Sequence, residues 1–405
     1  MALRILILTP RIPFPLKDGG AIAMNQTIEG YIDEGCVVSL LALNTSRSWV
    51  DEATLPAVYS KLKHFESVYV KTDVNPLSAF FNLFTDKSYN VERFINKQVE
   101  QRLLQLLQKE TFDIIQFESI YTSPYLKTAR KFSQATCVCR VHNIEHLIWQ
   151  RLSEHETSFL KRKYLKLLTN RLCNYELDIL KQFDLLLPIS KREELYFNTE
   201  KLNRCIYLPF GIDEKNIDVL KGTYDPNSCY HIGSMDWAPN IEGVQWFLDE
   251  VWSKACHELP DITLYLAGKN MPPSLLSKEN KQTDVVGEVD DFVQFSLEKN
   301  IMIVPLLAGA GIRVKILEAM SLGKTIITTS IGAEGIGAID GVHILISDTV
   351  DSFIQNLKLC FSNPENARQM GLNAKSFVEM NFQKKKIYAE MVAQLQEIAS
   401  KEPSE

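Results

Sequence analysis

Residues 301–323 read IMIVPLLAGAGIRVKILEAMSLG, and this stretch decides the fold of the second half of the chain. Its start, Ile301 to Val304, is a short apolar run typical of a parallel strand that is covered on both faces, and Pro305 ends the run. Residues 309–311 then leave the backbone bare, so that an anion can approach the free amides of the helix predicted over residues 312–322. Strand, glycine-rich loop and helix in this order predict a binding site for a phosphorylated ligand.

Two cations and one acid lie at the start of this predicted helix. Arg313 and Lys315 fall in its first turn, where the helix dipole disfavours positive charge by about 0.3–1 kcal/mol each, so we interpret them as ligands of a bound anion. Glu318 follows Lys315 by three positions on the same helical face and could bind sugar hydroxyls while the lysine binds phosphate. A surface ion pair between these two side chains is the alternative.

Length and composition set the outer limits. The chain has 405 residues, 45% of them hydrophobic, which exceeds one ordinary domain and predicts two. No stretch reaches the roughly 18 apolar residues of a membrane helix. The apolar run at residues 3–8 leads straight into Thr9 and Pro10 without a cleavage site, so we expect a core strand, not a signal peptide, and a cytoplasmic protein. The net charge of -6 argues against a general nucleic-acid binder.

Apolar runs alternate with helical stretches in both halves of the chain. The first half is predicted to hold strands at Arg4–Leu8, Val37–Leu43, Phe112–Phe117, Thr136–Val141 and Leu185–Pro188. The second half is predicted to hold strands at Cys229–Ile232, Thr263–Ala267, Ile301–Val304, Thr325–Thr328 and His343–Ile346, with helices near residues 243–254, 291–298 and 312–322. This alternation predicts two Rossmann-like domains, each an open parallel sheet with helices on both faces. The boundary is predicted between Ser190 and Gly211.

Five segments of the second half resemble retaining glycosyltransferases of family four, which have the GT-B fold. They are GSMDWAPN at residues 233–240, LAG at 266–268, VGEV at 286–289, GIRVKILEAM at 311–320 and GAEG at 332–335. The resemblance implies an α/β architecture with two Rossmann-like domains facing each other across a cleft. Residues 1–200 would form the acceptor side and residues 201–380 the nucleotide-sugar donor side, and a terminal helix at about residues 381–400 would pack back on the first domain.

The resemblance also implies a donor site. Glu318 would bind the nucleotide ribose, Arg313 and Lys315 would bind the pyrophosphate and act in catalysis, and residues 286–289 would surround the base. The donor-binding set is Gly19, Gly20, Ser234, Lys269, Val286, Gly287, Val289, Gly309, Ala310, Gly311 and Glu318. A solvated loop position is the alternative for Lys269, and an ordinary turn is the alternative for the pair Gly19 and Gly20.

The chain departs from the family at one position. Members commonly carry two glutamates separated by seven residues, and the second corresponds to Glu318 while the first falls on Ala310. In the family the first carboxylate helps to hold the donor sugar, so that contact is not carried over. The glycines around Ala310 also have the G-x-G spacing of a dinucleotide fingerprint, but Val314 occupies its third small-residue position.

Polar residues of the first half carry a thinner resemblance. His142 follows a predicted strand and so emerges at the carboxyl edge of the sheet, where open α/β sheets bind ligands, and it resembles the active-site histidine of the family. Glu145 belongs to the same segment, although a helix cap explains it nearly as well. Ser190 and Arg192 resemble the segment beside the cleft, where the arginine would reach phosphate, and a helix N-cap is the alternative for Ser190.

Neither the cysteines nor the adjacent acids predict a metal site. The eight cysteines are expected to be reduced core thiols, and we expect Cys137 and Cys139 to face opposite sides of a strand. We interpret Asp290 and Asp291 as a helix start, with Asp291 as the cap, because no D-x-D signature accompanies them. Cations can neutralise a departing diphosphate instead, so we expect a metal-independent reaction without a cofactor.

Residues 159–171 read FLKRKYLKLLTNR, with five basic residues and no acid. They could lie on an anionic membrane at the inner face, and a solvated helix that turns its leucines to the core is the alternative.

Taken together, these features predict a retaining, hexosyltransferase-like enzyme. It would move a sugar from a UDP- or GDP-linked donor to a hydroxyl of a glycan or lipid-linked acceptor in cell-surface polysaccharide synthesis. A GT-B sugar-nucleotide epimerase and a noncatalytic sugar-nucleotide-binding partner subunit are the alternatives.

Overall fold

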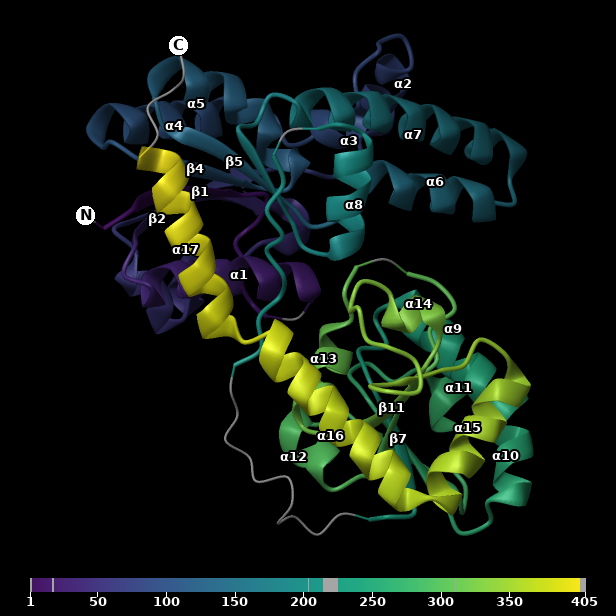
Figure 1. Cartoon of the computed structure of the whole chain (residues 1–405). Helices are drawn as coiled ribbons and strands as arrows, with labels where there is room; N and C mark the ends of the chain where they lie inside the picture. Colours follow the sequence, from purple (N-terminus) through teal and green to yellow (C-terminus); the bar gives the residue numbers. More distant parts are fainter. Residues whose placement is uncertain (1, 17, 203, 214–224, 310, 401–405) are drawn as a thin grey trace. The chain divides into compact units, whose positions relative to one another are not determined.

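A computed structural model describes the chain except for residues 1, 17, 203, 214–224, 310 and 401–405 (Figure 1). Of His155 it describes the backbone alone. The chain divides into two compact units: unit 1 comprises Met1–Phe210 and Lys385–Glu405, and unit 2 comprises Gly211–Lys384.

Unit 1 contains a six-stranded parallel sheet in the order β3-β2-β1-β4-β5-β6. Its strands are β1 (Arg4–Thr9), β2 (Val37–Thr45), β3 (His64–Val70), β4 (Ile114–Glu118), β5 (Thr136–Val141) and β6 (Leu185–Pro188). Strand order reverses between β1 and β4. The loops that leave the carboxyl ends of these two strands therefore flank the switch point, where sheets of this kind bind ligands.

Helices cover both faces of this sheet. On one face, α1 (Gly19–Asp33) packs with α17 (Lys384–Ser400), and the rings of Tyr31 and Tyr388 meet edge to face at 5.8 Å. Gly30 makes this contact possible, because a Cβ there would lie 2.3 Å from the Tyr388 ring. On the other face lie α4 (Lys97–Lys109), α5 (Leu126–Phe132) and α7 (Phe159–Leu180).

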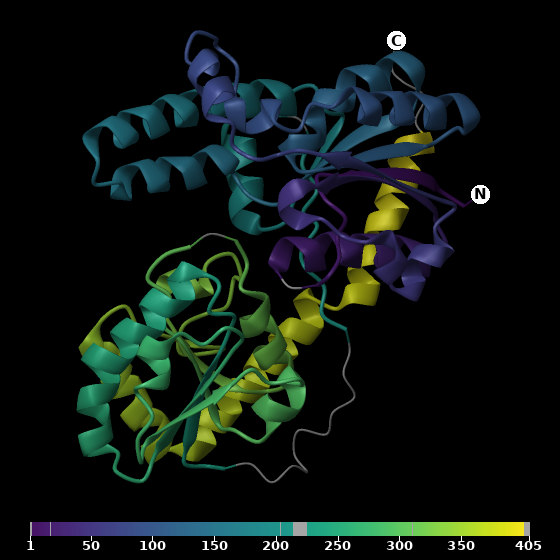
Figure 2. The same ribbon diagram turned by 180° about the vertical axis from the view of Figure 1, so that it is seen from behind.

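The remaining helices of unit 1 are short or project from the sheet. The hairpin of α6 (Glu145–His155) and α7 extends away from the sheet in both views (Figures 1 and 2). The others are α2 (Pro76–Asn82), α3 (Tyr89–Glu92), α8 (Lys191–Thr199) and 3-10 turns at Ser46–Ser48, Glu52–Thr54, Ala57–Lys61 and Ile120–Tyr125.

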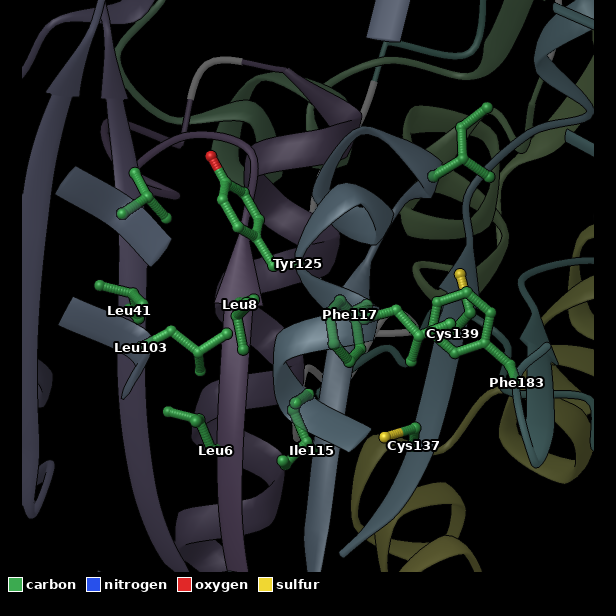
Figure 3. Packing of buried hydrophobic residues seen from close by; sticks show 14 of the residues in the cluster. Leu6, Leu8, Leu41, Leu103, Ile115, Phe117, Tyr125, Cys137, Cys139 and Phe183 are labelled. Carbon is green, nitrogen blue, oxygen red and sulfur yellow. The ribbon is translucent and has the colours of Figure 1, made fainter. Parts of the chain in front are cut away.

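The core beneath α4 and α5 contains both neighbouring cysteines. Figure 3 shows Cys137 and Cys139 of β5 beside Phe117 and Phe183, and all four side chains are buried in one cluster. The expectation that the two cysteines face opposite sides of the strand is wrong, because residues two apart on a strand share a face. Burial raises the pKa of the Cys137 thiol to about 12 and makes it an unreactive core group.

Unit 2 repeats the arrangement. Its six parallel strands have the order β12-β11-β10-β7-β8-β9. They are β7 (Ser228–Ile232), β8 (Thr263–Ala267), β9 (Thr283–Gly287), β10 (Ile301–Val304), β11 (Thr325–Thr328) and β12 (Leu345–Ile346). Counted along the chain, this is the strand order of unit 1, and the switch point lies between β7 and β10.

Nine helical segments surround the sheet of unit 2 in the part of the chain that the structure describes. They are α9 (Ala238–Trp246), a π-helical turn (Phe247–Trp252), α10 (Ser253–Glu258), α11 (Pro273–Leu276), α12 (Phe292–Leu297), α13 (Val314–Ser321), α14 (Ser330–Ala333), α15 (Val350–Ser362) and α16 (Pro364–Asn381). The helix expected near residues 243–254 is present, but it is longer and contains a π-helical turn: the segment ends α9, passes through that turn and begins α10.

The predicted α/β class with two Rossmann-like sheets is confirmed. Two strands, β3 and β9, were not anticipated, and each is the outermost strand at one edge of its sheet. Among the described residues, no helix combines the length and the apolar composition that crossing a membrane requires.

Candidate functional site

The loop after β10 and the start of α13 lie at the switch point of unit 2. The helix begins at Val314, so Arg313 precedes it by one residue and does not lie in its first turn as expected from the sequence. The Arg313 guanidinium lies 5.4 Å from the centre of the Trp237 ring, and its Nη1 donates to the carbonyl of Gly311 at 2.9 Å. Only 6% of Arg313 is exposed, so the cation is held inside the loop.

Glycine is required in this loop. Gly309 has a φ of +131° and Gly311 a φ of +82°, values that other residues rarely adopt. A Cβ on Gly309 would also lie 2.7 Å from Arg313 Nη2 and 2.9 Å from the Trp237 ring. The loop can therefore pass close to the arginine only without a side chain. Ala310 lies outside the described residues.

Lys315 contributes a second cation to this edge of the sheet. Its Nζ donates to Asn240 Oδ1 at 3.1 Å, and Asn240 Nδ2 donates to the carbonyl of Ser234 at 2.7 Å, so β7, α9 and α13 meet at this lysine. A Cβ on Gly233 would lie 2.9 Å from Nζ. Burial, reinforced by the charge of Arg313, lowers the pKa of Lys315 to about 7.

The charged Arg313 and the neighbouring Lys315, whose pKa is lowered, form a site that a diphosphate would stabilise. Among the described residues, no carboxylate forms an ion pair with Lys315. Nearby His231, which is fully buried behind the lysine, has its pKa lowered by burial and by the charge of Lys315. A bound anion would relieve this repulsion, because an opposite charge favours the protonated lysine.

The loops after β7, β8 and β9 form a hydrogen-bonded layer beside the cations. Gly233 N donates to Ala267 O at 3.1 Å, and Gly268 N donates to Gly287 O at 2.7 Å. A Cβ on Gly268 would lie 1.9 Å from Gly233 O, so this contact excludes any larger residue. The predicted donor-binding residues Ser234, Lys269, Val286 and Gly287 belong to this layer, and Val289 follows it.

The side chains of this layer differ in exposure and partners. Ser234 Oγ lies 3.2 Å from Asp236 Oδ2, and the backbone carbonyl of Lys269 accepts from Met235 N at 2.9 Å. Val286 is 42% exposed at the end of β9, where a flat ring could lie on it. Glu318 is partly buried on α13, one turn after Lys315.

At the switch point of unit 1, the glycine pair begins a helix. Gly19 and Gly20 are the first residues of α1, and Asp18 caps it by accepting from Ala21 N at 3.1 Å. Arg11 forms an ion pair with Asp18. Although burial opposes it, the hydrogen bond from Arg11 lowers the pKa of Asp18. Arg11 was not anticipated, and its signal is a cation in the loop that follows the first strand.

His142 and Glu145 lie at the carboxyl edge of unit 1, as predicted. His142 Nε2 is 2.6 Å from Glu118 Oε2, and this buried glutamate ends β4 beside the switch point. Glu145 accepts from Tyr121 OH at 2.9 Å. Burial first, and the charge of Glu176 second, raise the pKa of Glu145 to about 7. Glu118 was missed in the sequence, where an acid that ends an apolar strand is the only signal.

Two residues cap helices: Ser190, for which a cap was the alternative, and Asp291, for which a cap was the prediction. Ser190 is buried and caps α8 by accepting from Glu193 N at 3.4 Å, and Arg192 is exposed in the first turn of that helix. Asp291 caps α12 by accepting from Val293 N at 2.8 Å and Gln294 N at 3.1 Å. Among the described residues, no group of three or more potential metal ligands occurs.

Two parallel sheets of one strand order, with polar residues gathered at both switch points, define the GT-B class of glycosyltransferase fold. Solved structures agree. The chain superimposes on sucrose-phosphate synthase from Thermosynechococcus elongatus with a TM-score of 0.71 and 16% identity, over 98% of this chain and 99% of that one. It superimposes on HepE of Anabaena in complex with UDP with a TM-score of 0.65 and 14% identity, over 98% and 100% of the two chains.

Sequence comparisons identify the family of unit 2. Residues 226–363 match the model of the family described as Glycosyl transferases group 1, so the chain carries a domain of that family. Along 399 residues it is also 27% identical to an "Uncharacterized 44.6 kDa protein in cps region" of Klebsiella pneumoniae, which covers 95% of this chain and 98% of that protein.

Proposed function

We propose that this protein is a retaining glycosyltransferase that moves a sugar from a nucleotide-diphosphate sugar to a hydroxyl of a glycan or lipid-linked acceptor. The observation that carries the proposal is the desolvated pair Arg313 and Lys315 at the switch point of a group 1 domain. Such cations stabilise the charge that develops on the leaving diphosphate as the glycosidic bond breaks.

The comparisons support a uridine nucleotide donor. Structures of HepE are described as complexes with UDP and with UDP-glucose, and their fold is similar along the whole chain. The layer of loops that holds Ser234, Val286 and Gly287 would then contact the nucleotide, with Glu318 on the ribose. The cps region named for the Klebsiella relative supports polysaccharide synthesis as the setting.

Calorimetric titration with UDP, GDP and ADP, followed by their sugar conjugates, tests the donor site. We expect selective binding of one nucleotide, which weakens in Glu318→Ala and is unchanged in the matched control Glu379→Ala, an exposed acid of α16. A folded protein that binds none of the three would contradict the proposal. Product analysis with an acceptor, by the coupling of the anomeric proton, then tests retention.

A metal-independent reaction is part of the proposal. Arg313 and Lys315 together supply positive charge where a metal would otherwise neutralise the diphosphate. Turnover is therefore expected to persist in excess chelator. Complete loss of turnover that added metal restores would contradict this part alone.

Contact with an anionic membrane through residues 159–171 would bring a lipid-linked acceptor to the enzyme. Phe159 and Leu160 are 64% and 77% exposed at the start of α7, and Lys163 Nζ lies 4.6 Å from the centre of the Phe159 ring. Exposed apolar residues among lysines are typical of helices that lie in a membrane interface. The wild type should sediment with vesicles that contain phosphatidylglycerol, and the double variant Phe159→Ser/Leu160→Ser should sediment with them less. Equal sedimentation of the two proteins would reject the contact.

A further inference from the structure

His142 is joined to a chain of buried hydrogen bonds. Its Nε2 lies 2.6 Å from Glu118 Oε2, and Glu118 Oε1 accepts from Gln116 Nε2 at 2.6 Å. Gln116 Oε1 in turn accepts from Tyr31 OH at 2.7 Å. Gln116 and Glu118 are fully buried, as is Tyr31, whereas 12% of the His142 side chain is exposed. This series of hydrogen bonds therefore runs from the interior to the carboxyl edge of the sheet.

Tyr31, at the buried end of this series of hydrogen bonds, determines which group donates in each of them. Burial, reinforced by the proximity of Tyr388, raises the pKa of Tyr31 well above its usual value, so its hydroxyl keeps its proton and can donate. The oxygen of the Gln116 amide faces Tyr31, which turns the NH2 group toward Glu118. One oxygen of Glu118 is thereby occupied by a donor, and the other is left to accept from His142.

A buried arginine lies on the strand beside Glu118. Arg140 lies opposite Glu118 in the register of β4 and β5 and is fully buried. Its Nη1 donates to Ala23 O at 2.9 Å, while Nε and Nη2 have no hydrogen-bond partner among the described residues. Arg140 and Glu118 therefore lie on neighbouring strands, and placing opposite charges near each other lowers the cost of burying them.

These contacts assign the two ring nitrogens of His142. A carboxylate oxygen can only accept, so Nε2 carries the hydrogen that it donates to Glu118. In the neutral ring Nδ1 then has a free lone pair. Within the part of the chain that the structure describes, no residue hydrogen-bonds Nδ1.

We propose that Glu118, held by Gln116 and Tyr31, is a positioning residue that makes His142 Nδ1 a hydrogen-bond acceptor for a hydroxyl of the donor sugar or of the acceptor. The proposal rests on the proposed function, because it names the chemistry that one residue of that site presents. A histidine in this tautomer selects a hydroxyl donor and rejects an anion, which has no hydrogen to give.

A second histidine–glutamate pair in the same unit shows what a structural pair looks like. His146 Nδ1 lies 2.7 Å from Glu176 Oε2, and its Nε2 lies 3.1 Å from Tyr196 OH. Both ring nitrogens are occupied, and only 5% of the side chain is exposed. Glu176 holds the hydrogen on Nδ1 here, so the two histidines are expected in opposite tautomers.

Nitrogen-15 NMR of the full-length protein tests the assignment without substrate. The chain has seven histidines, and the signals of His142 are assigned by their loss in His142→Asn. In the wild type we expect the neutral His142 ring to be protonated at Nε2 and the neutral His146 ring at Nδ1. A wild-type His142 protonated at Nδ1 would overturn the proposal, and this result needs no variant of Glu118 to fold.

Glu118→Gln tests the positioning role. One of the two carboxylate oxygens becomes an NH2 group, which only donates, so the side chain no longer presents an acceptor to both Gln116 and His142. We expect the Nδ1-protonated form of His142 to appear and turnover to fall about ten- to a hundredfold, as for loss of a charge-assisted hydrogen bond. Tyr196→Phe, which alters only the His146 pair, is the matched control and should leave the His142 spectrum unchanged. An unchanged tautomer with unchanged turnover in Glu118→Gln would also overturn the proposal.

Binding data separate the two sources of the hydroxyl. If the donor sugar supplies it, Glu118→Gln weakens the binding of the nucleotide sugar but not of the free nucleotide. If the acceptor supplies it, nucleotide-sugar binding is unchanged and the KM for the acceptor rises. If no nucleotide sugar bound the wild type, the proposed function would be refuted. The NMR spectrum would still decide which nitrogen of His142 carries the hydrogen.

Discussion

The two units share one strand order but carry different titratable side chains at the carboxyl edges of their sheets. Unit 1 places the acids Glu118 and Glu145 at its carboxyl edge, together with His142, whereas unit 2 places the buried Arg313 and the partly buried Lys315 there. The pKa of Glu145 is raised and that of Lys315 is lowered, both to about 7. The topology therefore fixes where a site can form, and the residues at strand ends decide which chemistry it has.

The strongest test of this comparison removes a cation from unit 2. Lys315→Met removes the charge and shortens the side chain by only one atom, so we expect donor turnover to fall about ten- to a hundredfold from the loss of a charge-assisted contact. Steady-state kinetics measure the effect. Arg313→Ala should act in the same direction, and unchanged turnover in both variants would contradict the cation site.

A second buried lysine provides the control. Lys324 lies at the opposite, amino edge of the sheet, where Nζ donates to the carbonyl of Lys299 at 2.6 Å, and burial followed by the charge of Lys299 lowers its pKa to about 8. Lys324→Met should change stability but leave nucleotide affinity as it is. If Lys315→Met and Lys324→Met lost nucleotide affinity equally, binding would not depend on a lysine at the carboxyl edge.

The acidic edge of unit 1 can be tested through stability. The pKa of Glu145 is raised in the folded state, so its ionisation opposes folding: stability is lost as pH rises from the unfolded pKa to about 7, and the loss is constant above that pH. Glu145→Gln should therefore stabilise the protein by about 1–3 kcal/mol near pH 8 and by little near pH 4. Denaturant unfolding at the two pH values measures this. The exposed Glu154→Gln of the same helix should show no such gain.

The lowered pKa of Lys315 predicts that nucleotide affinity depends on pH. Lys315, with its pKa lowered to about 7, is largely uncharged in the free protein above that pH, and a bound diphosphate favours its protonated form. Nucleotide affinity should fall by up to about tenfold per pH unit above pH 7, with uptake of a proton on binding. Calorimetry in buffers of different ionisation enthalpy detects that proton. Uptake that persists in Lys315→Met would assign it to another group.

The smallest expected effect concerns Asp291, an acid of unit 2. Asp291 accepts from two backbone amides of α12, so Asp291→Ala should lower the free energy of unfolding by about 1 kcal/mol. Asp291→Asn, which keeps the cap, should cost less. A loss of turnover in Asp291→Asn that excess magnesium reverses would reveal a metal role and would weaken the contrast between the two units.

Burial explains which strands could be predicted from the sequence. The strands Thr136–Val141, Leu185–Pro188, Thr263–Ala267, Ile301–Val304 and Thr325–Thr328 have the predicted bounds, because strands that are largely buried read as apolar runs, and this holds even for Leu185–Pro188 at the edge of its sheet. The missed strands β3 and β9 are half-exposed edges with mixed sequences, HFESVYV and TDVVG. Neither shows the apolar run on which the prediction relied.

The site divides in the same way. Arg313, Lys315 and Glu318 are local to one helix start and could be predicted from their spacing. The contact of Arg313 with Trp237 and that of His142 with Glu118 join residues 76 and 24 positions apart, which follow only from strand order. Proximity of this kind leaves no periodic signal in the sequence.

The chain passes between the units twice, once after Phe210 and once after Lys384. The two passages run side by side within unit 2, where Ile212 pairs with Gln383 and a Cβ on Gly211 would lie 2.7 Å from the Lys384 backbone. An exchange with a related gene at a single breakpoint after Phe210 would also replace α17. Tyr388 of α17 would then be separated from the Gly30 against which it packs. Recombination can therefore transfer unit 2 by itself only as an insert with two breakpoints, one at each passage.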